Sequence, residues 1–320
     1  MQDTLAIIEK AIDELRIASH PINLYDPIKY IMSIGGKRLR PYLLLLTTKA
    51  FGSNEKDVVN QAIAIEIFHN FTLVHDDIMD HAPLRRGNDT VHKKWSTNIA
   101  ILAGDAMTVK AYEYLIENIK PEHCLNVLKI FNTTALKVCE GQQFDEDFEI
   151  QEKVEIDEYI HMIRLKTAEL LGGAMQIGAV LAGASEEEQE KIYDFAINIG
   201  TAFQLMDDLL DVYADQAKFG KQIGGDIIEN KKTYLYLKLE EKISDKDQLK
   251  WDILKQEKNK KNKVSEVTKL YDQYGIAEDT KKLIRLYYRE GMASLEQLSL
   301  ESSSKKEMVA FADKLMVREN

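Results

Sequence analysis

Apolar residues recur every three or four positions along most of the chain, which is the spacing of amphipathic helices. Leu5, Ile8, Ile12 and Leu15 show it near the N-terminus. The same spacing predicts helices at about 55–80, 93–118, 122–140, 157–184 and 186–215, and several shorter helices after about residue 232. No run of alternating apolar and polar residues is long enough to predict a strand. The pattern therefore predicts an all-α protein.

Several predicted helices have recognisable ends. Gly35-Gly36 is a helix-stop signal, Asn54 can cap the helix at about 55–80, and Pro83 prevents that helix from continuing. Ser185 and Glu188 form a capping-box pattern that separates the last two long helices. A group of lysines is expected in a solvated loop between helices: Lys258, Lys260, Lys261 and Lys263.

Composition supports the helical interpretation. The 320 residues are 45% hydrophobic and 30% charged, which suits a folded protein with a large core. No proline follows Pro121, and proline costs about 3 kcal/mol inside a helix. Length alone would suggest about two domains, but no low-complexity linker divides the chain. We therefore expect one domain over residues 1–320.

Charge and cysteine content indicate the setting. The net charge of −11 argues against a nucleic-acid partner or an anionic membrane surface. No apolar run reaches the roughly 18 residues of a membrane span, and no basic segment typical of a signal peptide opens the sequence. Cys124 and Cys139 lack metal-ligand spacing and are expected to be buried thiols. We therefore expect a cytoplasmic protein.

The pattern Asp-Asp-x-x-Asp occurs twice, as Asp76, Asp77 and Asp80 and as Asp207, Asp208 and Asp211. The first and last aspartates of each segment share one helix face, and aspartate is a poor helix former. Such a face can share Mg²⁺, which typically takes one or two carboxylates together with substrate phosphates and water. A single cluster could be a solvated acidic turn. Because the pattern is repeated within long helices, a metal-binding role is favoured.

Basic residues accompany both acidic segments. Gly35-Gly36-Lys37-Arg38-Leu39-Arg40-Pro41 combines three cations with a permissive backbone, and Arg85-Arg86-Gly87 follows the first segment. Lys166-Thr167, Lys221 and Lys231 flank the second. Guanidinium groups bind phosphate oxygens in a bidentate manner, whereas lysine acts as a point charge. Together, these residues predict a site that binds diphosphates through metal ions. No nucleotide-binding fingerprint is present.

With these motifs, the sequence resembles the trans-isoprenyl diphosphate synthases, or polyprenyl synthetases. The resemblance extends from Gly35 to about Thr233: the acidic segments match the family's two Asp-rich motifs, and Gly35 to Pro41 matches its GGKxxRP element. It implies the isoprenoid synthase fold, a single bundle of antiparallel helices around a central cavity, and a homodimer. It also implies Mg²⁺-dependent head-to-tail condensation of isopentenyl diphosphate with an allylic diphosphate, which would be dimethylallyl, geranyl or farnesyl diphosphate.

The resemblance assigns roles to particular residues. It implies about three Mg²⁺ ions, held through Asp76, Asp80 and Asp207. The expected catalytic groups are all six aspartates with Lys166 and Lys221. Isopentenyl diphosphate is expected at Lys37, Arg40, His69 and Arg86. The allylic diphosphate is expected at Arg85, Lys166 and Lys221. The remaining expected substrate-binding residues are Gly36, Thr167, Gln204 and Lys231. The departing diphosphate is the expected base, which leaves His75 a structural or supporting role.

Product length should depend on side chains one or two turns before Asp76, namely Thr72, Phe71, Phe68 and Ile67. At about 100° per residue, an ideal helix puts Thr72 beneath Asp76 and Phe71 about 140° away. Geometry alone favours Thr72, whereas the resemblance nominates Phe71, which is aromatic where long-chain synthases have a small residue. A ring there suggests a product of roughly C15 to C20, with geranylgeranyl favoured over farnesyl. The alternative is that Phe68 and Phe71 are core residues.

Two rival functions belong to other classes. A class I terpene cyclase would carry one Asp-rich motif with a different Asn/Ser/Glu metal motif, and it would not need the element from Gly35 to Pro41. A non-catalytic regulatory subunit would have lost one acidic segment, whereas both are intact. Elongation of an allylic primer by labelled isopentenyl diphosphate separates the three possibilities.

Overall fold

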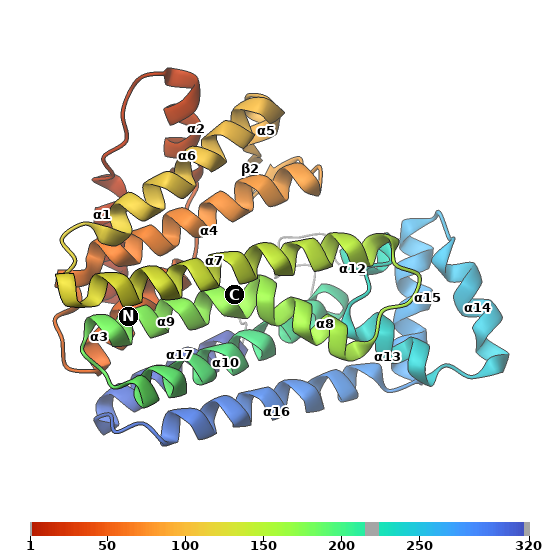
Figure 1. Ribbon diagram of the computed structural model, residues 1–320. Coiled ribbons are helices and arrows are strands. Elements are labelled where there is room, and N and C mark those ends of the chain that lie inside the picture. The colour runs from red at the N-terminus through yellow and green to blue at the C-terminus, as the bar shows by residue number, and fades with distance from the viewer. Residues whose placement is uncertain (1, 215–223, 317–320) are drawn as a thin grey trace. The chain divides into compact units, whose positions relative to one another are not determined.

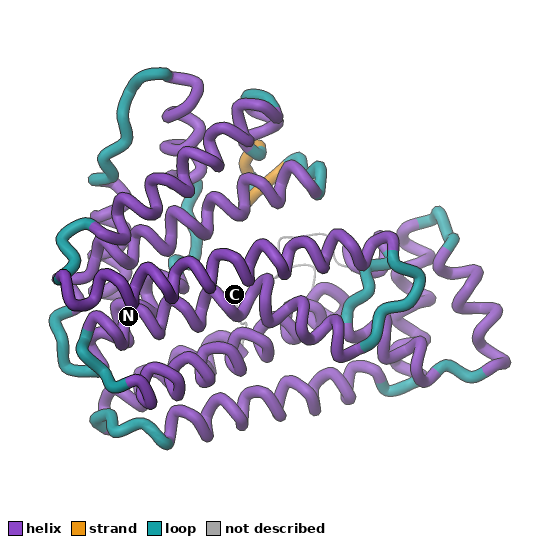
Figure 2. The backbone as a smooth tube through the Cα atoms, viewed as in Figure 1, coloured by secondary structure: helices purple, strands orange, loops and turns teal. Residues whose placement is uncertain are grey.

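The computed structural model describes residues 2–214 and 224–316, and most of them lie in helices (Figures 1 and 2). The all-α prediction is therefore confirmed. Internal contacts divide the chain into two compact units. Unit 1 comprises Met1–Thr133 and Gly173–Glu190, and unit 2 comprises Thr134–Gly172 and Lys191–Asn320. The expectation of one domain over residues 1–320 stays a prediction.

Unit 1 is built around a helix that is buried on every side. Its elements are α1 (Gln2–Asp13), α2 (Ile22–Ser33), α3 (Leu39–Ala50), the 3₁₀ turn η1 (Glu55–Val58), α4 (Val59–Met79), strands β1 (Leu84–Arg85) and β2 (Asn88–Asp89), α5 (Val91–Lys94) and α6 (Thr97–Ile116). Helix α4 packs against α1, α2, α3, α5 and α6, and every residue from Gln61 to Phe68 is buried. Such burial explains why this stretch is apolar except at Gln61 and Glu66, whose polar groups have hydrogen-bond partners inside the protein.

Unit 2 contains the C-terminal helices. Its elements are α8 (Ile156–Ile163), the π-helical turn η2 (Arg164–Ala168), α12 (Gly225–Glu229), α13 (Tyr234–Lys242), α14 (Asp245–Lys255), α15 (Lys260–Gln273), α16 (Ile276–Glu296) and α17 (Ser302–Met316). The unit boundaries fall within α7 (Pro121–Ile150), α9 (Glu169–Leu181) and α10 (Glu186–Tyr213). Leu205, Leu235, Leu239, Trp251 and Tyr271 are central members of its apolar core.

The predicted caps are present. The Asn54 side chain accepts a hydrogen bond from the backbone N–H of Lys56 at 3.2 Å, at the start of η1. The Ser185 hydroxyl accepts from the backbone N–H of Glu188 at 3.3 Å, and the Glu188 carboxylate accepts from the Ser185 N–H at 2.9 Å. The reciprocal pair satisfies two donors at the beginning of α10.

Some details predicted from the sequence are wrong. Helix α7 continues to Ile150, and two-residue strands β1 and β2 pair where no strand was expected. Lys260, Lys261 and Lys263 lie in the first turn of α15, and Lys263 is buried because its ammonium donates to the carbonyl oxygens of Ile228 (3.0 Å) and Lys255 (3.3 Å).

The cysteine prediction is also wrong, since Cys139 is exposed and Cys124 is half-buried. The neighbouring Val138 faces the core, and one residue further along a helix a side chain is turned by about 100°.

Within residues 2–214 and 224–316, no helix has both the length and the apolarity required to cross a membrane.

A glycine allows α7 to approach the π-helical turn closely. A Cβ atom at Gly141 would lie 2.3 Å from the backbone nitrogen of Lys166 and 2.7 Å from the carbonyl carbon of Leu165. Both contacts are with backbone, which cannot move aside as a side chain can. Because π turns are rare and strained, the close packing against Gly141 helps to explain where this one forms.

A buried polar network connects three helices of unit 2. The Glu169 carboxylate of α9 accepts from the Lys137 ammonium of α7 at 2.9 Å and from the Tyr193 hydroxyl of α10 at 2.7 Å. Glu169 is only 4% exposed, so its charge requires these partners. The network therefore connects α9, which begins directly after the π turn, to α7 and α10.

We expect Gly141→Ala to lower the free energy of unfolding by about 1–3 kcal/mol, because the added methyl group overpacks the backbone of the π turn. Urea denaturation measures the change. Thr133→Ala, on an exposed face of the same helix, should change stability by no more than about 0.5 kcal/mol. Equal stabilities of the two variants would contradict this account of the turn.

Candidate functional site

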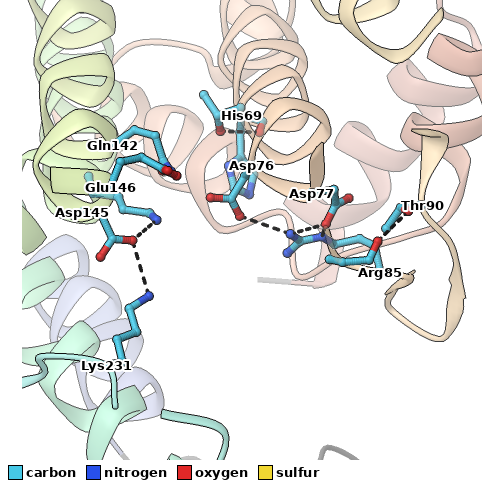
Figure 3. Close-up of polar contacts among 12 residues, drawn as sticks. His69, Asp76, Asp77, Arg85, Thr90, Gln142, Asp145, Glu146 and Lys231 are labelled. Atoms are coloured by element: carbon cyan, nitrogen blue, oxygen red, sulfur yellow. Dashed lines mark hydrogen bonds and ion pairs between the residues drawn. The ribbon is translucent and has the colours of Figure 1, made fainter. Parts of the chain in front are cut away.

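The first acidic segment lies at the C-terminal end of α4. Asp77 is completely buried, whereas Asp76 is partly exposed and Asp80 is exposed as the C-cap. Arg85, from β1, donates to Asp77 Oδ1 from Nε (2.9 Å) and Nη2 (2.6 Å), and to Asp76 Oδ2 from Nη2 (3.3 Å). Figure 3 shows this guanidinium bridging the two carboxylates. The short hairpin therefore holds a cation against the acidic segment.

The middle aspartate of this segment differs in environment from its neighbours. Burial raises the pKa of Asp77, while the hydrogen bonds and charge of Arg85 oppose that rise. The carboxylate is thus engaged with Arg85 inside the protein. Asp76 and Asp80 are the members of the segment that are more exposed to solvent.

The second acidic segment, in α10, repeats this arrangement. Asp208 is 5% exposed, whereas Asp207 and Asp211 are half-buried. The hydroxyl of Tyr159, from α8, donates to Asp208 Oδ2, and Gln204 Nε2 donates to its Oδ1 at 3.1 Å. In both segments the middle carboxylate is buried with a partner, and the outer two are more accessible.

A pocket of about 210 Å³ lies in unit 2 beside the second segment. Its lining combines acidic, basic and neutral side chains: Asp145, Tyr159, Met162, Ile163, Lys166, Thr167, Gln204, Asp207, Asp208, Asp211, Asp226 and Lys231. Burial and the charges of Asp208 and Asp211 raise the pKa of Asp226. The excess of carboxylates is a feature that bound cations would compensate.

Two predicted substrate-binding lysines of this pocket share one carboxylate. Asp145 Oδ2, from α7, accepts from Lys166 Nζ at 2.6 Å. It also accepts from Lys231 Nζ at 3.4 Å, as Figure 3 shows. Burial alone would raise the pKa of Asp145, but the two ammonium groups hold it below its usual value. Asp145 was not among the predicted site residues, because the helical pattern predicted an end near residue 140.

Of the other substrate-binding residues predicted in this region, Thr167 and Gln204 lie within the described part of the chain. The Thr167 hydroxyl donates to Gln204 Oε1 at 3.0 Å, so these two side chains do lie together. Thr167 and Lys166 belong to the π turn, whose position against Gly141 brings both to the pocket. Lys221 lies outside the described residues.

A second group of predicted residues meets in unit 1, around the turn that follows α2. Arg40 Nη1 is 3.1 Å from His69 Nε2, and Arg86 Nη1 donates to the carbonyl oxygen of Gly35. A Cβ atom at Gly36 would lie 2.8 Å from Arg86 Nη1, so glycine permits this approach. Lys37 is exposed beside them.

Burial and the closeness of several positive charges determine the electrostatics of this group. Burial lowers the pKa of Arg40 to about 10, although the charge of Glu66 opposes the change. Burial and the positive charges of Arg40 and Arg86 lower the pKa of His69 well below its usual value. His69 is therefore neutral and can accept from Arg40 through Nε2.

The predicted chain-length residues form part of an aromatic cluster on α4. Phe68 is 2% exposed, with its ring centroid 5.2 Å from that of Phe131 and 5.3 Å from that of Phe71. Phe71 is only partly buried, and the Thr72 hydroxyl donates to the carbonyl oxygen of His69 at 2.8 Å. Phe68 is therefore a core residue, whereas Phe71 and Thr72 are both partly exposed.

His75 packs within unit 1. Its ring centroid is 4.9 Å from that of Phe71, and its Nε2 is 3.3 Å from the carbonyl oxygen of Ile101. A Cβ atom at Gly104 would lie 2.2 Å from His75 Nε2, so α6 has a glycine where the ring needs space. These contacts suit the structural role expected for His75.

The donor chemistry fits magnesium, because the available ligands are hard carboxylate oxygens. Over residues 2–214 and 224–316, no three His, Cys, Asp or Glu side chains are grouped closely enough to hold a metal ion by themselves. Mg²⁺ usually needs only one or two protein carboxylates when substrate phosphates and water complete its shell. The residues present therefore fit ions that bind together with a phosphorylated substrate.

Comparison with known proteins relates the whole chain to one family. Residues 21–271 match the family Polyprenyl synthetase. The geranylgeranyl diphosphate synthase of Methanosarcina mazei is 38% identical over 314 residues, which are 98% of this chain and 95% of that protein. The geranylfarnesyl diphosphate synthase of Natronomonas pharaonis is 39% identical over 248 residues, 72% of this chain and 73% of its own.

A solved structure gives the same result. The crystal structure of a geranylgeranyl pyrophosphate synthase superposes with a TM-score of 0.95 at 45% identity, covering 100% of this chain and 99% of that one. The predicted family resemblance is confirmed, and with it the isoprenoid synthase fold. The chain belongs to the polyprenyl synthetase family and is a prenyltransferase.

Proposed function

We propose that this prenyltransferase condenses isopentenyl diphosphate head-to-tail with an allylic diphosphate, in a Mg²⁺-dependent reaction that gives an all-trans product of roughly C15 to C20. The observation that carries the proposal is the repeated acidic arrangement: each Asp-rich segment buries its middle carboxylate and leaves the outer two accessible beside cationic side chains. Metal-bound diphosphate chemistry needs such a combination of hard oxygen ligands and phosphate-binding cations.

In this proposal, the outer carboxylates hold the metal ions. Asp76, Asp80 and Asp207 are the assigned ligands, in a family that is metal-dependent. Bound Mg²⁺ supplies electrostatic stabilisation of the departing diphosphate. Asp77 and Asp208 act from inside the protein, where Asp77 fixes Arg85 and Asp208 orders Tyr159 and Gln204. Asp211 completes the second accessible face.

Cationic side chains bind the two substrates. We assign the allylic diphosphate to Arg85, Lys166 and Lys221, and isopentenyl diphosphate to Lys37, Arg40, His69 and Arg86. The other proposed substrate-binding residues are Gly36, Thr167, Gln204 and Lys231. Cations close to the leaving group stabilise the charge that develops as the allylic C–O bond breaks. The double bond of isopentenyl diphosphate then attacks the allylic cation, and the departing diphosphate accepts the proton that is lost.

The rival functions fit the site less well. A terpene cyclase would have no use for the group formed by Lys37, Arg40, His69 and Arg86. A regulatory subunit would not require both acidic segments with their buried partners.

A homodimer is part of the proposal, supported by exposed apolar side chains on α6 at Ile101, Leu102 and Val109. The same proposal includes a cytoplasmic location and one functional domain over residues 1–320.

Chelation should abolish turnover, and added Mg²⁺ should restore it. Asp76→Ala and Asp207→Ala should each lower the rate by orders of magnitude with little loss of stability, because they remove partly exposed helix aspartates. Asp77→Ala should instead cost about 1–3 kcal/mol of stability, since Arg85 loses its two hydrogen bonds to the buried carboxylate and keeps only the one to Asp76. Rates and urea denaturation separate the effects. Asp89→Ala, an exposed aspartate of β2, is the matched control, and near-normal activity of Asp76→Ala would refute the metal assignment.

The two substrates should respond to different cations. Lys37→Ala and Arg40→Ala should mainly raise the KM for isopentenyl diphosphate. Lys166→Ala and Lys221→Ala should instead impair the reaction of the allylic substrate. Loss of a charge-assisted contact costs about 1.5–3 kcal/mol, which is roughly a 10- to 150-fold change. Steady-state kinetics with each substrate varied in turn make the measurement. Lys29→Ala, an exposed lysine of α2, should change neither KM, and equal effects on both substrates would remove the division of roles.

Product length should be set by Phe71, with a geranylgeranyl product favoured over farnesyl. Phe71→Ala should lengthen the product with activity retained, because the ring is only partly buried and its loss opens space beside α4. Chromatography of the hydrolysed products gives the chain length. Thr72→Ala serves as the comparison: longer products from this variant alone would move the limiting position from Phe71 to Thr72.

A further inference from the structure

The cation-rich turn from Gly35 to Pro41 contains one arginine that does not face solvent. Arg38 is 3% exposed, although its neighbour Lys37 is exposed and Arg40 is half-buried. Its backbone has a φ of 48°, in the left-handed region that non-glycine residues rarely adopt, and it is the N-cap of α3. A residue held in such a conformation needs support from its surroundings.

That support comes from three hydrogen bonds to three different helices. Arg38 Nε donates to Glu9 Oε1 of α1 at 3.0 Å, and Nη2 donates to the carbonyl oxygen of Met32 of α2 at 2.9 Å. Nη1 donates to Glu66 Oε1 of α4 at 2.8 Å. The planar guanidinium is suited to this because its donors point in fixed and different directions. A lysine ammonium at the same place could not reproduce all three directions.

The partner carboxylate is built into the interior. The side chains of Arg38 and Glu66 are each only 2% exposed, and Glu66 Oε1 also accepts from Asn70 Nδ2 at 3.1 Å. Breaking a buried ion pair of this kind leaves an uncompensated charge. The pair is therefore a rigid connection between the turn and α4.

The same connection reaches the residues assigned to isopentenyl diphosphate. His69 lies three residues after Glu66 on α4, and Arg40 lies two residues after Arg38. Arg40 Nη1 meets His69 Nε2 at 3.1 Å, and Arg40 Nε is buried without a hydrogen-bond acceptor among the described residues. The negative charge of Glu66 also favours the charged forms of Arg40 and Arg86.

We propose that Arg38 and Glu66 are positioning residues for the non-allylic substrate: their buried ion pair holds the turn so that Lys37 and Arg40 are in place before the diphosphate arrives. The inference rests on the proposed function, which assigns isopentenyl diphosphate to Lys37, Arg40, His69 and Arg86. A site ordered in advance loses less conformational freedom on binding, so affinity for this one substrate depends on the pair.

The test is steady-state kinetics of the full chain with each substrate varied in turn. Arg38→Lys and Glu66→Gln should raise the KM for isopentenyl diphosphate by about tenfold or more. The KM for the allylic diphosphate and kcat should change by less than about twofold. The double variant should show little further rise, because both changes break the same connection.

Two further variants serve as a stability control and as a milder change at Arg38. Gln61→Leu removes a different buried contact of α4, in which Gln61 Nε2 donates to the carbonyl oxygens of Leu115 (3.1 Å) and Glu117 (2.9 Å). It should lower stability and leave both KM values unchanged. Glu9→Ala removes only the outermost contact of Arg38, at a half-exposed carboxylate, and should raise the KM for isopentenyl diphosphate by a smaller factor even if Arg38→Lys does not fold.

The outcomes are distinguishable. Equal rises in both KM values, or no rise for isopentenyl diphosphate in Glu9→Ala and the folded pair variants, would overturn the positioning role while the prenyl transfer stands. A wild-type chain that elongates no allylic primer would overturn the proposed function itself.

Discussion

A carboxylate removed from water needs a partner, and much of the site depends on this constraint. Each Asp-rich segment places its middle aspartate inside the protein, and the two aspartates have different hydrogen-bond donors. Arg85 donates to Asp77, whereas Tyr159 and Gln204 donate to Asp208. The partner is ordered by the buried charge, so the acidic segment and the groups beside it form one rigid arrangement. The outer aspartates are more accessible, and the proposed function assigns the metal ions to Asp76, Asp80 and Asp207 among them.

In the turn after α2, the charges that need a partner are positive. Three cations close together would repel one another, and Glu66 supplies a buried negative charge among them. Arg38 pairs with that charge, and the proposed function assigns the neighbouring Lys37 and Arg40 to isopentenyl diphosphate. In unit 2, Asp145 has a comparable relation to Lys166 and Lys231. Oppositely charged groups outside the two motifs therefore order the cations that the proposed reaction uses.

The sequence predicted the local features well because they depend on nearby residues. Helical periodicity, the Asn54 cap and the Ser185–Glu188 capping box are all present. The predictions that were wrong depend on distant contacts. Helix α7 continues past Gly141, where it packs against the backbone of Lys166. Lys263 is buried because carbonyl oxygens of Ile228 and Lys255 accept from it.

The sequence by itself determined the class of fold, the two acidic segments, the cation-rich turn and the family, because periodicity and motif spacing are properties of the chain. Only the tertiary structure decided which aspartate of each segment is buried, which arginine of the turn faces inward, and that Asp145 joins two lysines. Residues of one motif look equivalent in sequence. They become different when packing removes some of them from water, since each buried charge must then find a partner from another part of the chain.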